Sequence, residues 1–138
     1  VVGFHREFNF DVLSAALTAV RNGARLIGSN SDPTYPTPFG PIPGGGSILA
    51  AIEHATGVQA VVTGKPHQSM ADLVASLDPG VGAHEMMMVG DVVTTDGAFA
   101  RTLGCGFGLV LSGMTPSADG IDADLVGVNL AAIVDQIL

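Results

Sequence analysis

Two carboxylates follow an apolar run of this sequence. The run covers residues 86–89 and ends on Gly90-Asp91, and a second acid, Asp96, comes five residues after Asp91. An uninterrupted apolar run is typical of a buried strand in a parallel sheet, so Asp91 is predicted to lie at the strand's carboxyl end. Open parallel α/β sheets bind their ligands at that edge. Carboxylate oxygens suit Mg²⁺, whose remaining coordination positions are filled by water and phosphate oxygens.

One lysine is predicted to lie at the same edge. Lys65 follows an apolar stretch over residues 58–63, and it is one of only five basic residues in the chain. Its positive charge would stabilise the negative charge that gathers on phosphoryl oxygens. Lys65, Asp91 and Asp96 therefore indicate metal-assisted phosphate chemistry. A purely structural role fits as well, in which Asp91 caps the following helix and Asp96 lies in its first turn.

The elements that must position these side chains alternate along the second half of the chain. Apolar runs and turn residues predict strands over 58–63, 86–90, 107–111 and 124–128, and helices over 68–77, 98–103 and 130–138. This alternation predicts an α/β fold with a parallel sheet, right-handed crossovers and covering helices. Lys65, Asp91, Asp96 and the loop over 112–115 would then share one edge of the sheet.

The first half is predicted to hold elements of its own. These are a strand over 1–4, a helix over about 12–20 capped by Asn9 or Asp11, a strand over 25–28, and a helix from Ser47 that Gly57 ends. Five prolines between residues 33 and 43 argue against any regular element over 33–46. The glycines over 44–46 allow two interpretations, a tight helix entry or an anion-binding turn of a nucleotide-binding domain.

The composition and net charge of the chain argue against several classes of binding partner. The chain has 138 residues, is 47% hydrophobic and carries a formal net charge of −8, so we expect one well-packed chain with neither nucleic acid nor an anionic membrane as partner. The single Cys105 cannot form an internal disulfide, which favours a cytoplasmic location. The four histidines have no zinc-like spacing.

Several motifs occur in an order that resembles the haloacid-dehalogenase (HAD) superfamily of phosphatases. Gly64-Lys65-Pro66 and the later Gly90-Asp91-x-x-x-Thr95-Asp96 look like the third and fourth motifs of that superfamily. Residues 2–4, 30–36, 43–47 and 112–115 look like the large-capped branch that contains p-nitrophenyl-phosphate, phosphoglycolate and nucleotide phosphatases. The resemblance runs essentially from end to end.

The resemblance implies a partial HAD-like Rossmannoid parallel sheet with helices on both faces, plus the C-terminal part of an α/β cap. Residues 1–57 would belong to the cap and residues 58–138 to the core. Lys65 would neutralise the phosphoryl group and the nucleophile, and Asp91 would bind Mg²⁺. Asp96 would support the metal site without touching the metal. Gly90 and Thr95 would belong to the loop at the phosphate edge.

The same resemblance implies the reaction and the substrate contacts. Such enzymes hydrolyse small phosphate monoesters through an aspartyl-phosphate that forms on a separate Asp. His5, Arg6, Asn30 and Asp32 would contact a small phosphorylated metabolite from the cap. His5 stands where relatives usually have Asp, and Val92 and Thr94 replace polar residues that are common in the fourth motif.

The nucleophile of the superfamily has no counterpart in this chain. Its Asp-x-Asp motif ends the central strand, whereas Asp122-Ala123-Asp124 precedes a predicted strand. The chain is therefore expected to be a C-terminal fragment with little activity by itself. Because a missing central strand leaves sheet edges unpaired, we expect a homo-oligomer or a dependence on the absent half. The alternative is a noncatalytic α/β binding or interaction module.

Overall fold

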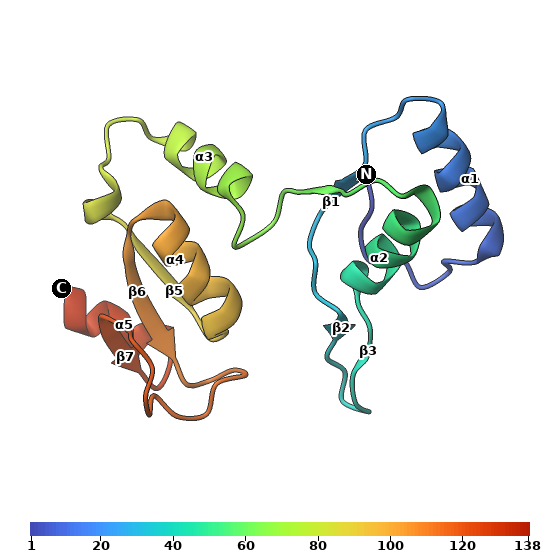
Figure 1. The fold of residues 1–138 in the computed structure, drawn as a ribbon. Helices are drawn as coiled ribbons and strands as arrows, with labels where there is room; N and C mark the ends of the chain where they lie inside the picture. The colour runs from blue at the N-terminus through green and yellow to red at the C-terminus, as the bar shows by residue number, and fades with distance from the viewer. The chain divides into compact units, whose positions relative to one another are not determined.

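The computed structural model describes residues 1–138 and divides into two compact units, Val1–Gly64 and Lys65–Leu138 (Figure 1). The sequence places the boundary after residue 57. The structure keeps the following residues with the first unit because β4 (Val61–Val62) pairs in parallel with β1 (Ile27–Gly28). This pairing removes β4 from the parallel sheet that the sequence predicts for the second half.

Two helices build the core of the first unit. α1 (Phe10–Arg21) begins after Asn9, whose side chain accepts the Val12 N–H, so of the two caps that the sequence allows, Asn9 and Asp11, the structure uses Asn9. α2 (Gly45–Thr56) ends at Gly57, which has the left-handed φ of 70° that favours glycine. The two helices enclose a small apolar core whose buried members are Leu26, Leu49 and Ile52.

The proline-rich segment holds a hairpin, so the prediction of no regular element there is wrong. β2 (Thr34–Tyr35) pairs antiparallel with β3 (Ile42–Pro43), in the register Thr34 to Pro43 and Tyr35 to Ile42. Proline is compatible with such a short edge pairing because only one side of each strand needs its backbone donors. The predicted strand over 1–4 is reduced to a single parallel bridge between Val2 and Gly28.

The second unit is a three-stranded parallel sheet. Its strands lie in the order β5 (Met87–Gly90), β6 (Gly106–Val110) and β7 (Leu125–Gly127). α3 (Gln68–Leu77) precedes the first strand, α4 (Ala98–Leu103) connects β5 to β6, and α5 (Leu130–Ile137) follows β7. Each lies within two residues of its predicted position. The parallel α/β architecture expected from the sequence is confirmed.

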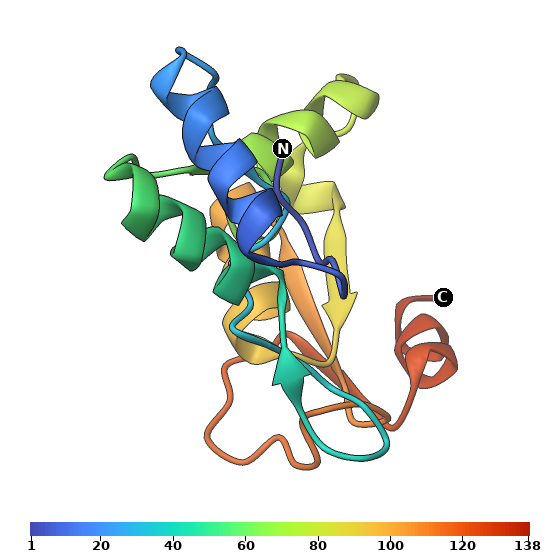
Figure 2. The same cartoon turned by 90° about the vertical axis from the view of Figure 1, so that its right-hand side faces the viewer.

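Helices cover both faces of this sheet. Phe107 and Leu109 of β6 are buried together with Ala100 of α4. Gly108, which points the opposite way, faces Ile133 of α5, and a Cβ added to it would lie 3.3 Å from the Ile133 side chain. α4 and α5 therefore lie on opposite sides of the strands, as Figure 2 shows. No helix in the structure is both long enough and apolar enough to cross a membrane.

Candidate functional site

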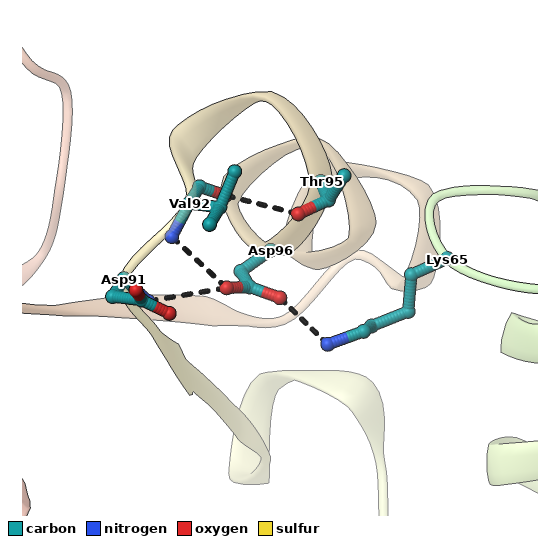
Figure 3. Close-up of polar contacts among 5 residues, drawn as sticks. All are labelled: Lys65, Asp91, Val92, Thr95 and Asp96. Atoms are coloured by element: carbon teal, nitrogen blue, oxygen red, sulfur yellow. Dashed lines mark hydrogen bonds and ion pairs between the residues drawn. The ribbon is translucent and has the colours of Figure 1, made fainter. Parts of the chain in front are cut away.

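The carboxyl end of β5 is shaped by the side chain of Asp96. The chain leaves Gly90 through a wide helical turn over Val93–Gly97, and Asp96 in that turn is only 5% exposed. Its Oδ2 accepts the N–H groups of Asp91 and Val92, both at 3.1 Å (Figure 3). A Cβ on Gly90 would lie 2.2 Å from this oxygen, so glycine is required for the carboxylate to fold over the strand end.

Lys65 occupies the other oxygen of the same carboxylate. Its Nζ lies 2.6 Å from Asp96 Oδ1, and the two residues come from positions 31 apart in the chain (Figure 3). The lysine side chain is 43% exposed, so solvent screens the pair and its contribution to stability is modest. An ammonium group has three donors, and this ion pair leaves donors of Lys65 for an anion.

Asp91 turns away from the helix that follows it. Its Oδ2 accepts the Met114 N–H at 2.6 Å, and its main-chain oxygen accepts the Thr115 hydroxyl at 2.5 Å. No side chain caps the turn that begins after Val92, so the prediction that Asp91 is a helix cap is wrong. The cause is that Oδ2 of Asp91 points to the loop after β6 and accepts the Met114 N–H, whereas a cap would have to accept an N–H two or three residues later in the turn.

These contacts leave one carboxylate oxygen for a metal ion. Both oxygens of Asp96 are occupied, whereas Oδ1 of Asp91 makes no hydrogen bond. The chain contains no group of three His, Cys, Asp or Glu residues that could enclose a metal. Mg²⁺ often takes only one or two protein carboxylates with water and phosphate oxygens, so the donor at Asp91 fits part of a Mg²⁺ site.

The remaining predicted site residues lie in the first unit. His5 and Arg6 line a cavity of about 400 Å³ whose other walls are apolar. Asn30 accepts the Asp32 N–H through its side chain at 3.3 Å, and a Cβ on Gly45 would lie 3.0 Å from the same Asn30 oxygen. His5 and Arg6 are thus brought together at one cavity, and Asn30 lies beside the start of α2.

Two features of these regions were missed from the sequence. Phe4 and Tyr35 stack at the first unit's surface with ring centroids 5.1 Å apart. The sequence places the loop over 112–115 at the sheet edge but does not predict that Met114 and Thr115 bond to Asp91. The signal in the sequence that could have indicated this contact was the run Ser112-Gly113-Met114-Thr115 directly after an apolar strand. Thr95 and Gly90 were both expected at the phosphate edge. Gly90 ends β5 beside the Asp96 carboxylate, and Thr95 lies in the turn over Val93–Gly97, where its hydroxyl donates to Val92 O at 3.4 Å.

Comparison with known proteins identifies the family. The HAD-hydrolase-like family matches residues 62–137. The 5'-nucleotidase YutF of Bacillus subtilis is 36% identical over 83% of this chain and 44% of its own length. The p-nitrophenyl phosphatase from Archaeoglobus fulgidus superposes with a TM-score of 0.88 at 33% identity, over 98% of this chain and 55% of that structure.

A third relative was crystallised with a metal ion. The glycerol phosphate phosphatase from Mycobacterium tuberculosis, in complex with calcium, has a TM-score of 0.78 at 30% identity, over 91% of this chain and 38% of that structure. The chain spans about half the length of the curated relatives it matches, or less. With its parallel sheet and the Lys65, Asp91 and Asp96 motifs at the end of β5, the chain belongs to the HAD-like hydrolases, in the branch of NagD and the p-nitrophenylphosphatases.

Proposed function

We propose that this chain is the C-terminal portion of a Mg²⁺-dependent phosphatase that hydrolyses small phosphate monoesters. The observation that carries the proposal is the 2.6 Å ion pair between Lys65 and Asp96, which lies directly beside Asp91 at the end of β5. A cation and a carboxylate held together at one strand end suit phosphoryl transfer. In this proposal the first unit belongs to the cap and the second unit to the core.

Each side chain has a separate task in the proposed reaction. Lys65 binds phosphoryl oxygens with the donors that Asp96 leaves open, and Asp96 holds the ammonium group in place. Asp91 is the ligand that this chain offers to Mg²⁺, and the calcium-bound relative supports a metal site of this kind. Bound Mg²⁺ supplies positive charge that offsets the charge of the phosphate.

The nucleophile comes from outside this chain in our proposal. An Asp in the other half of the protein attacks phosphorus, the ester oxygen leaves, and water then hydrolyses the aspartyl-phosphate. The 138-residue chain by itself is therefore expected to show little or no turnover. His5, Arg6, Asn30 and Asp32 remain our candidates for contacts with the organic part of a phosphorylated metabolite. A cytoplasmic location suits the free thiol of Cys105.

The test is an assay of the complete protein with p-nitrophenyl phosphate, with and without Mg²⁺. Asp91→Asn is expected to lower kcat/KM by more than about 100-fold, because even residues that only orient a metal ligand typically contribute roughly 10–100-fold. The control is Asp122→Asn, which removes the same charge from an exposed side chain. Phosphate release that needs no metal, or that is unchanged in Asp91→Asn, contradicts the proposal.

A noncatalytic binding module is the alternative that the same assay separates, because such a module releases no phosphate in either condition. A nucleotide-binding role for the glycines at the start of α2 has less support. The Gly46 N–H donates to Asp32 O at 2.9 Å and the Gly44 N–H to Pro33 O at 2.8 Å, so the chain's own carbonyls occupy donors that an anion would need. Nucleotide binding that persists in Asp91→Asn would favour this role.

The open edge of β5 motivates a further expectation for the isolated chain. β5 pairs only with β6, and apolar side chains at the surface include Leu130 and Ile137 of α5. We expect the isolated chain to self-associate or to be poorly stable. A well-behaved monomer in sedimentation equilibrium at micromolar concentration would contradict this.

A further inference from the structure

Three consecutive residues after β6 hold Asp91 from one side. The Met114 N–H donates to Oδ2 of Asp91, and the Thr115 hydroxyl donates to its main-chain oxygen. Gly113 contributes by lacking a side chain, because a Cβ there would lie 1.9 Å from Oδ2 and 2.4 Å from Cγ. We call residues 113–115 the Asp91 clamp.

The clamp fixes the direction of the carboxylate. The main chain of Asp91 is held by Thr115 and by Asp96, so the Cα position is set from two sides. The bond to Oδ2 then fixes the rotation of the side chain, and Oδ1 is the oxygen that stays open. A hydrogen bond from an N–H to an ionised carboxylate is stronger than one between neutral groups, so this orientation is well defined.

Packing does not explain the clamp. The Met114 side chain is 66% exposed, and Gly113 and Ser112 are exposed as well. The loop therefore contributes little to the apolar core of the second unit, and its polar contacts with Asp91 are its principal interaction with the strand end.

We infer that Gly113, Met114 and Thr115 are positioning residues that aim Oδ1 of Asp91 at the divalent cation. This inference rests on the proposed function, because it needs Asp91 to be a metal ligand. Residues that orient a ligand in this way typically change metal affinity by roughly 10–100-fold when they are replaced.

Two matched pairs of variants test the clamp in the complete protein, with Mg²⁺ alone as the probe in isothermal titration calorimetry. Met114→Pro removes the N–H that bonds Oδ2, and Met114→Ala keeps it. Thr115→Val removes the hydroxyl, and Thr115→Ser keeps it. We expect Met114→Pro and Thr115→Val each to weaken Mg²⁺ binding about 10–100-fold, with the paired controls close to the parent protein. The rate at saturating Mg²⁺ should largely recover in both weakened variants.

The outcomes separate failure of the clamp from failure of the proposed function. Equal Mg²⁺ affinity within both pairs, together with loss of binding in Asp91→Asn, would overturn the clamp and leave the metal ligand intact. Mg²⁺ binding that survives Asp91→Asn would overturn the proposed function, and the clamp with it. Thermal unfolding in EDTA monitors folding of each variant. Where Met114→Pro alone is unstable, the Thr115 pair decides, because it changes no backbone group.

Discussion

Two glycine-containing segments of this molecule differ in whether their polar groups are all bonded within the chain. At the start of α2, the N–H groups of Gly44 and Gly46 donate to main-chain carbonyls of Pro33 and Asp32, and the Ser47 hydroxyl also donates to Pro33. At the end of β5, backbone N–H groups are satisfied by Asp96, while Oδ1 of Asp91 and further donors of Lys65 stay open.

The glycines themselves have the same function in both turns. A Cβ on Gly46 would lie 2.3 Å from Ser31 O, and one on Gly90 would lie 2.2 Å from Asp96 Oδ2. Each glycine allows a close approach of another part of the chain. Glycine richness therefore does not distinguish a ligand site from a packed turn. The distinction comes from which charged groups remain without a partner inside the chain.

The largest effect expected to sharpen this comparison is that of Lys65→Met on catalysis. We expect kcat/KM for p-nitrophenyl phosphate to fall about 100–1000-fold in the complete protein, as for loss of one donor that stabilises developing charge. Stability should change by less than about 1 kcal/mol, because Lys65 is 43% exposed. Arg101→Met, an exposed cation on α4, is the control for loss of charge. A similar fall in kcat/KM in Lys65→Met and Arg101→Met would contradict a specific role for the open donors of Lys65 at the end of β5.

A smaller effect is expected on stability from Asp96→Ala. The substitution leaves the N–H groups of Asp91 and Val92 without their acceptor at a partly buried strand end, so we expect a loss of about 2–4 kcal/mol in urea unfolding. Asp124→Ala removes the acceptor of one N–H group, that of Phe107, from a residue that is itself exposed, and is expected to cost about 1 kcal/mol. If the two variants lose the same stability, Asp96 does not organise the strand end.

The smallest effect concerns the first turn of α2. Gly46→Ala should lower the free energy of unfolding by about 1–3 kcal/mol, because the new methyl group meets a main-chain carbonyl that cannot rotate away. Gly80→Ala is the matched control, with Asp78 Oδ1 at 3.4 Å as the nearest neighbour of its Cβ, and should change stability by less than about 0.5 kcal/mol. A neutral Gly46→Ala would show that the turn has room for a ligand after all.

Local signals in the sequence predicted the helices well. Asn9 caps α1 and Gly57 ends α2, because both rules depend on the conformation of one or two residues. Strand partners were predicted less well. β4 pairs with β1, and the segment with five prolines forms a hairpin, since both outcomes depend on which distant backbone groups are available. Asp124, part of an Asp-x-Asp, accepts a bond from Phe107 and holds β6 beside the start of β7.

The sequence by itself determined the types and order of the reactive residues, the alternation of elements in the second half, and the motifs of the HAD superfamily. The tertiary structure decided which atoms of those residues are used. Lys65 and Asp96 are 31 positions apart, and Asp91 and Met114 are 23 apart, so their contacts arise only in the folded chain, where the segment before α3 and the loop after β6 both reach the end of β5. Spacing along the chain cannot distinguish the two oxygens of a carboxylate, whereas packing leaves one of them open.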